Sequence, residues 1–218
     1  MNIILDKKFL LRRTSINFIN QKLKDNPNWN ILDIGCGYTA NKFAKIIADV
    51  QDLSTFYKDK KFVKIIGKNL PFKDNEFDFV ITSHVIEHVE DFQFFIKEIE
   101  RISKQGYIEL PTRLDDNLVV ENLKDHIWWF KFDDEFKLLT ASKKNQILEP
   151  FINVSTAKKL ALIFRESFVI ELLWENKIEY KIDNDLQMKF QPTISFMHLI
   201  KKYFSKKIRV FFSSLKSK

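Results

Sequence analysis

The stretch from residue 31 to residue 37, Ile-Leu-Asp-Ile-Gly-Cys-Gly, constrains the fold of this chain more than any other. A short apolar run leads into Asp33 and is broken by Gly35 and Gly37, which can follow a tight turn and let a ligand approach the backbone closely. The chain has only 4 glycines in 218 residues, so two in one turn indicate a position that requires glycine. The pattern predicts a strand that ends in a ligand-binding turn.

Apolar runs of strand length alternate with helical patterns along the first half of the chain. We expect strands at 29–34, 46–50, 62–66, 77–82 and 107–110, and helices at 6–25, around 41–45 and from 88 to 103. Such an alternation predicts right-handed crossovers and a mostly parallel sheet. Ligands of such sheets lie at the carboxyl ends of the strands.

The pattern becomes less regular after Pro111. We expect a hairpin strand at 136–141, a helix at 155–165, and a closing strand pair formed by 168–174 and 178–182. The aromatic run Trp128-Trp129-Phe130 has no clear period, and both a pocket lining and an ordinary core position are open for it. The expected organisation is an N-terminal packing helix at 1–28, a domain at 29–185 with a substrate-covering insertion at about 112–150, and a tail at 186–218.

Composition limits the classes of protein to consider. The one cysteine, Cys36, excludes an intramolecular disulfide and a cysteine-rich zinc site. The chain opens with no cleavable signal pattern and has no apolar run near the ~18 residues of a membrane span, so we expect a cytoplasmic protein.

The net charge of +7 is concentrated in the tail. Residues 186–218 hold eight Lys or Arg and no Asp or Glu, interleaved with large apolar residues. Two interpretations of this tail are equally favoured: a helix docked on the body, and a surface-lying helix that contacts the inner face of a membrane. Nucleic-acid binding ranks third, because the apolar content exceeds what phosphate contacts require.

Three segments in order carry a resemblance to a known family. They are Asp33 to Gly37, then Leu70-Pro71-Phe72 through Val80, and Ser83-His84-Val-Ile-Glu87-His88-Val89. Together they resemble class I S-adenosylmethionine-dependent methyltransferases, in the type 11 branch that modifies small molecules and glycans, over roughly residues 29–112. The resemblance implies a three-layer α/β sandwich with a doubly wound, mostly parallel, seven-stranded Rossmann-like sheet. It also implies S-adenosylmethionine as the cofactor.

The resemblance assigns cofactor contacts residue by residue. The turn from Asp33 to Gly37 would receive the amino acid end of the cofactor, and Asp49, ahead of Asp52, would bind the ribose hydroxyls. Asn69 would stand near the adenine, where Gly67-Lys68-Asn69 replaces the acid that the family usually carries. The full expected set is Asp33, Gly35, Cys36, Gly37, Asp49, Asn69, Leu70, Ser83 and His84.

Two histidines are candidates for the catalytic base, since an imidazole suits deprotonation of a hydroxyl acceptor. They are His84, after the fourth strand, and His126, in the covering insertion. The residues His84, Glu87 and His88 also spell His-x-x-Glu-His, a zinc-hydrolase signature. No third ligand is evident nearby in the sequence, so we expect no metal.

We therefore expect methyl transfer to an oxygen or a nitrogen of a small molecule, a saccharide or a lipid-linked intermediate. The first alternative is a binding or scaffolding protein that keeps the fold without activity, because the acid before Leu70 is missing and the first crossover is short. A zinc hydrolase that uses the His-x-x-Glu-His motif ranks below it. Nucleic acid is not an expected partner. The acceptor itself and the oligomeric state stay open.

Overall fold

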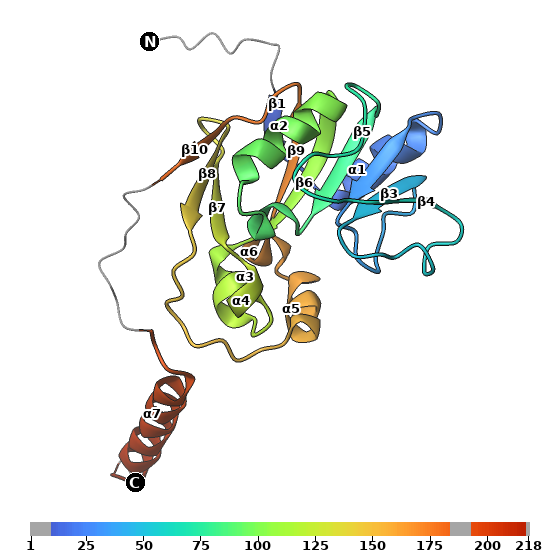
Figure 1. Ribbon diagram of the computed structural model, residues 1–218. Coiled ribbons are helices and arrows are strands. Elements are labelled where there is room, and N and C mark those ends of the chain that lie inside the picture. Colours follow the sequence, from blue (N-terminus) through green and yellow to red (C-terminus); the bar gives the residue numbers. More distant parts are fainter. Residues whose placement is uncertain (1–9, 184–192, 217–218) are drawn as a thin grey trace, which may run out of the picture.

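The computed structural model describes residues 10–183 and 193–216, and its centre is one seven-stranded sheet (Figure 1). The strands follow the order β1-β9-β6-β5-β2-β3-β4 across the sheet. Their bounds are β1 (Leu10–Arg13), β2 (Ile31–Ile34), β3 (Ile46–Asp49), β4 (Lys61–Lys64), β5 (Phe79–Ser83), β6 (Gln105–Pro111) and β9 (Val169–Glu175). The order and the pairing confirm the predicted α/β fold with a mostly parallel seven-stranded sheet.

Five neighbouring strands form the parallel centre of this sheet. Strand β2 pairs in parallel with β3 and β5, β3 with β4, and β5 with β6, whereas β9 is antiparallel to β6 and to β1. All four residues of β2 are buried, as expected for a central strand covered on both faces. The parallel strands end at one edge, which brings the residues that follow β2, β3 and β5 together.

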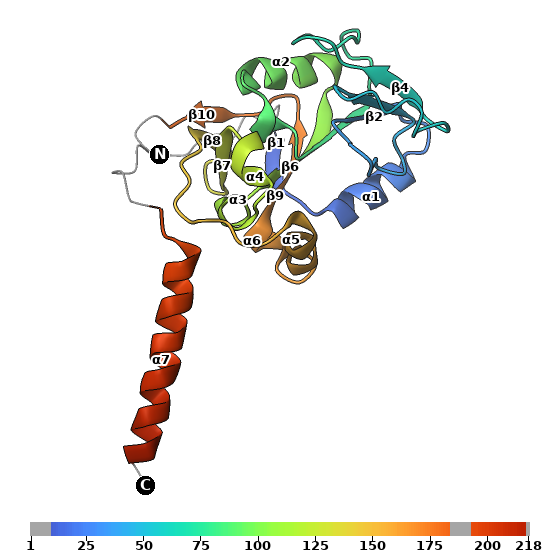
Figure 2. The same ribbon diagram turned by 60° about the horizontal axis from the view of Figure 1, so that its bottom comes forward.

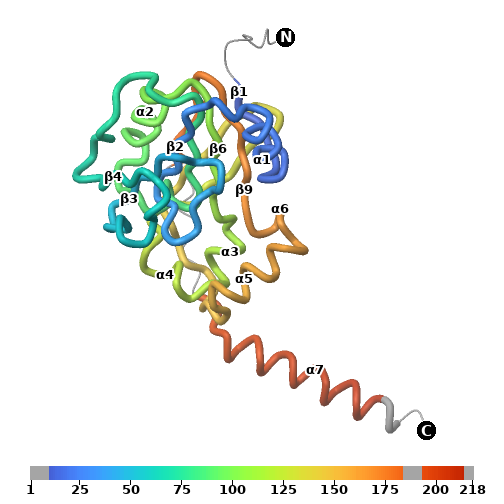
Figure 3. Tube along the Cα trace, turned by 90° about the vertical axis from the view of Figure 1, so that its right-hand side faces the viewer, coloured from blue at the N-terminus to red at the C-terminus, as the bar shows by residue number. Residues whose placement is uncertain are grey.

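Helices cover both faces of the sheet. Alternate side chains of β5 point to opposite faces, so Phe79 and Ile81 pack with α1 (Ile16–Asp25), and Val80 packs with α2 (Phe92–Ile102). Figures 2 and 3 show α1 and α2 on opposite sides of the sheet. The predicted three layers are therefore present.

A second, three-stranded sheet packs on the α2 face. It contains β7 (Trp128–Asp133) and β8 (Leu138–Lys143) as an antiparallel pair, with β10 (Tyr180–Ile182) parallel to β8. The ring of Phe92 on α2 lies 4.8 Å from that of Trp128 and 5.6 Å from that of Tyr180. The aromatic run of β7 is therefore core, and the predicted hairpin strand at 136–141 is confirmed as β8.

The predicted pairing of 168–174 with 178–182 is wrong. Strand β9 lies between β1 and β6 in the large sheet, so both of its edges are already hydrogen-bonded. Residues 180–182 instead extend the small sheet as β10.

The predicted helix at 6–25 is also shorter than expected. Residues 10–13 form β1, which pairs with β9, and the helix begins at Ile16 after the cap Ser15, whose hydroxyl accepts from the Phe18 N–H. Pairing with a neighbouring strand overrides the local helical pattern, and Leu11 is buried as a result. Residues 6–9 lie outside the described part of the chain.

The short helix expected around 41–45 is absent, and these residues form turns. Asn41 explains the difference, because its side-chain oxygen accepts from the Phe43 N–H (2.9 Å) while its own N–H donates to Asp33 Oδ2 (2.7 Å). Such side-chain bonds compete with a helical ladder. The β2-to-β3 crossover therefore contains no helix.

The helix expected at 88–103 is shorter and forms α2, with a separate 3₁₀ turn before it. Residues Ile86–His88 form the 3₁₀ turn η1, and α2 begins at Phe92 after Asp91, which accepts from the Phe94 N–H. The helix expected at 155–165 forms as α5 (Val154–Ala161), separate from α6 (Arg165–Phe168). Between β6 and β7 lie α3 (Arg113–Leu118) and α4 (Asn122–Asp125).

The tail forms α7 (Phe196–Lys216), which projects away from the body in Figure 2. Its start is tied to the body by the Phe196 N–H, which donates to Glu149 Oε2 (2.8 Å), and by stacking of Phe196 on Phe151. Between residues 197 and 212 most of its large side chains are exposed, Phe204 and Phe211 by 57% and 60%, which disfavours a helix docked along the body. Among the described residues, no helix is long and apolar enough to span a membrane.

Candidate functional site

The cofactor turn, Gly35–Tyr38, leaves the carboxyl end of β2 with two residues at positive φ. Gly35 has φ of +65° and Gly37 has φ of +51°, a region that favours glycine. A Cβ on Gly35 would lie 2.5 Å from Cγ2 of Val85, whereas a Cβ on Gly37 would meet nothing within 4 Å. The Gly35 N–H donates to the Ala48 carbonyl of β3 (2.7 Å). Close packing therefore fixes Gly35, and backbone conformation alone accounts for Gly37.

Two buried carboxylates stand beside this turn. Asp33 Oδ2 accepts from the Asn41 N–H, and Asp49 Oδ2 accepts from the Gly37 N–H (3.1 Å) while Oδ1 accepts from the Gln51 N–H (2.9 Å). Burial raises the pKa of Asp33 to about 7, although the Asn41 N–H and the charge of Lys60 act to lower it. A carboxyl so buried is stabilised in its charged form by an added cation.

Asp52, the competitor of Asp49, has a local role instead. It is exposed, and its Oδ1 accepts from both the N–H and the hydroxyl of Ser54 (3.1 and 2.7 Å), bonds that lower its pKa. Asp49, by contrast, is tied directly to the cofactor turn. This geometry favours Asp49 over Asp52.

Cys36 is a packed thiol. It is buried, and burial, with Asp33 nearby, raises its pKa to about 11, so the thiol is protonated at neutral pH. Its place in the turn is therefore structural rather than reactive.

Tyr57 braces the turn and is absent from the predicted site. Its hydroxyl donates to the Gly37 carbonyl (2.9 Å) and accepts from the Ala40 N–H (2.9 Å). Tyr38 stays exposed, with its ring edge-on to Phe56 and its hydroxyl accepting from Gln51 Nε2 (3.1 Å). An aromatic side chain twenty residues beyond the turn carries no sequence pattern that would reveal the brace.

The loop at 69–72 is held from α2. Leu70 is buried in the core and its N–H donates to Glu98 Oε2 (2.8 Å), while Arg101 donates to the carbonyls of Leu70 (3.1 Å) and Phe72 (2.8 Å). Asn69 is exposed and makes no hydrogen bond that the structure describes. The loop is thus fixed by Leu70, with Asn69 left at the surface.

His84 follows Ser83, the last residue of β5, in a left-handed conformation with φ of +54°. Its Nε2 lies 3.2 Å from Glu109 Oε1 and its Nδ1 lies 3.2 Å from Glu87 Oε1. Desolvation lowers the pKa of His84, whose side chain is still 41% exposed, but the two carboxylates outweigh it and raise the pKa to about 10. The imidazole is therefore protonated at neutral pH, which disfavours His84 as a proton acceptor.

A charged network extends from His84 across the sheet. Tyr107 Oη lies 2.6 Å from Glu109 Oε2 and 2.9 Å from Glu171 Oε1, and Arg165 donates to both carboxylates. Burial among these carboxylates raises the pKa of Tyr107 well above its ordinary range, so the phenol stays protonated. The network spans β6, β9 and α6 and holds His84 in place.

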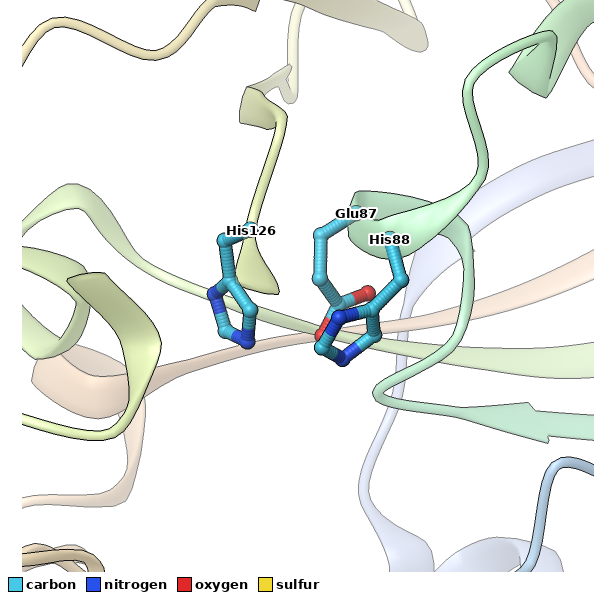
Figure 4. Close-up of side chains that lie close together, drawn as sticks. All are labelled: Glu87, His88 and His126. Carbon is cyan, nitrogen blue, oxygen red and sulfur yellow. The ribbon is translucent and has the colours of Figure 1, made fainter. Parts of the chain in front are cut away.

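His126 lies close to His88 and Glu87 (Figure 4). We call His84, Glu87, His88 and His126 the histidine cluster. His126 is buried, and its Nδ1 is hydrogen-bonded to Asp116 Oδ1, which also lies 3.9 Å from Lys144 Nζ. The rings of His88 and His126 are 4.5 Å apart and nearly perpendicular. An imidazole held by a carboxylate at Nδ1 presents its Nε2 lone pair as a base or a ligand.

The structure thus brings the predicted residues together in two neighbouring groups. Asp33, Gly35, Cys36, Gly37 and Asp49 surround the cofactor turn, and Ser83 with the histidine cluster follows β5. Val85 connects them, because its side chain packs against Gly35 while its neighbour His84 belongs to the cluster. Asn69 and Leu70 lie on a separate loop.

A surface cavity of about 430 Å³ lies elsewhere. Its lining contains none of the predicted site residues and consists of Arg13, Thr14, Ser15, Arg165, Glu166, Val169 and Glu171. This cavity is therefore separate from the candidate site, which is marked by the positive-φ glycines and the buried carboxylates.

The residues around the cofactor turn fit S-adenosylmethionine. Asp33 would offer a buried carboxyl to the ammonium group, and each oxygen of Asp49 keeps a lone pair beyond its one backbone hydrogen bond. The two glycines leave the backbone open to close approach.

Comparison with known proteins agrees with this geometry. Residues 32–108 match a family described as a methyltransferase domain, a span that holds the cofactor turn, Asp49 and His84 but not His126. The chain is 28% identical over 170 residues to protein MJ1123 of Methanocaldococcus jannaschii, covering 74% of this chain and 80% of that one. It is 31% identical over 96 residues to demethylmenaquinone methyltransferase of Corynebacterium glutamicum, covering 39% of this chain and 42% of that enzyme.

Among solved structures, protein PH0226 of Pyrococcus horikoshii OT3 has 16% sequence identity and a TM-score of 0.44, over 74% of this chain and 89% of that one. The matched residues and the sheet order, rather than this superposition, indicate the family. Residues 32–108 thus match a methyltransferase domain, and together with the sheet order they support a class I S-adenosylmethionine-dependent methyltransferase with S-adenosylmethionine as its cofactor.

Proposed function

We propose that this chain methylates an oxygen or a nitrogen of a small molecule, a saccharide or a lipid-linked intermediate. The observation that supports it most is the contact between Gly35 and Val85, which sets the cofactor turn beside the histidine cluster. A methyl donor held at the turn would have its reactive end near groups that manage a proton. No described residue needs to form a covalent intermediate for this chemistry.

In the proposed reaction the chain aligns the two substrates, and proximity supplies much of the rate. The bond from sulfur to methyl breaks as the bond from methyl to the acceptor atom forms. The cofactor supplies the methyl group as an electrophile, and S-adenosylhomocysteine is the product that leaves.

The acceptor proton would pass to His126. Its Nδ1 is engaged by Asp116, which leaves Nε2 to receive the proton and stabilises the imidazolium that results. His84, with its pKa raised to about 10, would instead supply a fixed positive charge beside Glu109 and Glu87.

Binding of S-adenosylmethionine to the full chain, measured by calorimetry, tests the first half of this proposal. We expect saturable binding that Asp33→Asn and Asp49→Asn each weaken about tenfold, the loss of one charge-assisted contact. Asp52→Asn is the matched control and should leave the affinity unchanged, since the hydrogen bonds that Asp52 makes within the described residues go to Ser54. Absence of binding at millimolar cofactor would overturn the proposal.

Formation of S-adenosylhomocysteine with a panel of hydroxyl and amine acceptors tests the second half. We expect turnover with at least one acceptor, and a loss of about 100-fold in His126→Gln, within the range for a general base. Cofactor binding with no turnover on any acceptor, in a chain whose histidine cluster is intact, would favour the non-catalytic scaffold instead.

We propose further that α7 brings the protein to an anionic membrane surface. Ile200, Phe204, Ile208 and Phe211 recur at helical spacing along one face, and Lys202, Lys206 and Arg209 lie on the opposite face. Residues 193–216 include no acidic residue. A helix with a broad apolar face and only basic charges fits an anionic lipid surface.

Co-sedimentation of the full chain with vesicles tests this contact. We expect pelleting with vesicles that contain phosphatidylserine, little with neutral vesicles, and loss of pelleting in the double variant Phe204→Ser, Ile208→Ser. The control Ser205→Ala, on the polar face of the same helix, should pellet like the parent chain. Equal pelleting of the double variant would remove the membrane proposal.

A further inference from the structure

Three side chains with metal-ligating groups converge where η1 meets the segment after α4. Glu87 and His88 come from η1 and His126 from the residue that follows α4 (Figure 4). One nitrogen of each imidazole and one carboxylate oxygen of Glu87 all lie within 4.8 Å of one another. The sequence motif His-x-x-Glu-His would pair His88 with His84, but the fold pairs it with His126.

Hydrogen bonds prepare both imidazoles for a metal. The Nδ1 of His126 faces the carboxylate of Asp116, and the Nδ1 of His88 lies 2.9 Å from the carbonyl oxygen of Asp125. Both partners are acceptors, so each Nδ1 carries the hydrogen and each Nε2 keeps a lone pair. Histidines that ligate metals donate their other N–H in this way.

Glu87 is buried and has an oxygen that is left without a partner among the described residues. Its side chain is 0% exposed, and neither carboxylate oxygen accepts a hydrogen bond within the described ranges. Oε1 forms an ion pair with His84 Nδ1 at 3.2 Å, so the oxygen left for a further cation is Oε2. A buried carboxylate normally has its lone pairs satisfied by donors or by a cation.

The backbone holds the two segments in register. The Ile127 N–H donates to the Glu87 carbonyl (2.8 Å), and Trp128 Nε1 donates to the Val89 carbonyl (3.1 Å). Lys144 also donates to the carbonyl of Asn122, at the start of α4. These bonds keep His126 beside η1 whether or not an ion is bound, so the site is largely preformed.

We propose that Glu87, His88 and His126 bind one divalent transition-metal ion of the Zn²⁺ class. Two imidazole nitrogens and one carboxylate oxygen are a donor set that such ions accept, and three protein ligands leave a position open for a further oxygen or nitrogen. Bonds of about 2.0–2.1 Å require the donors to draw closer than 4.8 Å. His88 is exposed and can rotate to supply that movement.

Binding of an ion would change the role of His126. Its Nε2 lone pair would be taken by the metal, and an acceptor hydroxyl at the open position would lose its proton more readily. This consequence rests on the proposed function, whereas the binding itself does not. Metal binding and cofactor binding are therefore measured separately.

Titration of the chelator-treated full chain with Co²⁺, followed by visible absorption, and with Zn²⁺, followed by calorimetry, tests the site. We expect one ion per chain and an affinity loss of more than about 100-fold in His88→Gln and in His126→Gln, which each remove a ligand. Asp116→Asn should weaken binding by about 10- to 100-fold, because it acts only through His126. His198→Gln, on α7, is the matched control and should bind like the parent chain.

His88→Gln decides the question even if changes at the buried positions impair folding, since His88 is exposed. His84→Gln distinguishes a site that pairs His88 with His84 from one that pairs His88 with His126. We expect this variant to retain the ion. The inference fails if no stoichiometric ion binds while S-adenosylmethionine still does, if His88→Gln binds normally, or if His84→Gln abolishes binding while His126→Gln retains it.

Discussion

The cofactor turn and the histidine cluster lie at neighbouring strand ends, yet different contacts hold them. The turn is built from backbone: positive φ at Gly35 and Gly37, a Gly35 N–H bonded to Ala48, and a Gly37 N–H bonded to Asp49. The cluster is built from charged side chains, with His84 between two carboxylates and His126 against Asp116. Substitutions that add volume should therefore destabilise the turn, and substitutions that remove charge should destabilise the cluster.

Gly35→Ala should give the largest effect. The new Cβ meets Val85 Cγ2 at 2.5 Å in a left-handed conformation, and a valine has little freedom to rotate away. Strain and overpacking together should lower the free energy of unfolding by about 2 to 5 kcal/mol. Urea denaturation measures it.

Gly37→Ala is the matched control for that change. It has the same kind of backbone strain with no neighbour within 4 Å, so we expect a loss of only about 1 to 2 kcal/mol. Adding Val85→Ala to Gly35→Ala should recover part of the larger loss. Equal losses at the two glycines would contradict the close-packing account.

Glu109→Gln, in the charged network of the histidine cluster, should give the second largest loss of stability. It removes the charge that pairs with His84 and Arg165, and we expect a loss of about 2 kcal/mol in the free energy of unfolding. Glu90→Gln, at an exposed position six residues after His84, should change stability by less than about 0.5 kcal/mol. A neutral result at Glu109 would show that the network contributes little.

The affinity for S-adenosylmethionine should rise about tenfold between pH 5.5 and 7. The pKa of Asp33 is raised to about 7, so its carboxylate forms over this range, while the α-amino group of the cofactor, with an ordinary pKa near ~8, stays charged. Asp33→Asn should remove the slope. Calorimetry across this pH range gives both curves, and a flat curve for the parent chain would place the ammonium group elsewhere.

Tyr57→Phe should give the smallest effect. It removes one hydroxyl that bonds to the Gly37 carbonyl and the Ala40 N–H, a loss of about 1 kcal/mol. Tyr38→Phe is the control at the exposed surface, where water replaces the bond to Gln51. Thermal unfolding of the two variants compares their midpoints. A larger decrease in the midpoint for Tyr38→Phe than for Tyr57→Phe would contradict the claim that Tyr57 stabilises the turn.

The same contrast explains which parts of the site can be predicted from sequence. The turn lies within residues 33–49, where a buried strand, two glycines and an acid at the next strand end form a continuous pattern. The cluster depends on residues 84–88 meeting residues 116–144, a contact made by tertiary folding. His126 could be proposed as a candidate by residue type, but its partners Asp116 and Lys144 could not.

In the fold, too, elements with a strong local pattern are predictable from sequence, whereas elements decided by tertiary contacts are not. The buried runs at 31–34, 46–49 and 79–83 predict the parallel centre, because each is covered on both faces. Residues 10–13 and 180–182 have weak local patterns, and pairing with β9 and β8 decides their structure. At 41–45, hydrogen bonds from Asn41 prevent a helix that local spacing suggests.

Backbone hydrogen exchange of the full chain with and without S-adenosylmethionine tests the central claim most directly, because it locates the bound cofactor. We predict slowed exchange in the cofactor turn, residues 35–38, and at residues 50–51 after Asp49, with little change around the 430 Å³ cavity that Arg13 and Arg165 line. Protection at that cavity, or no protection anywhere at saturating cofactor, would contradict the account.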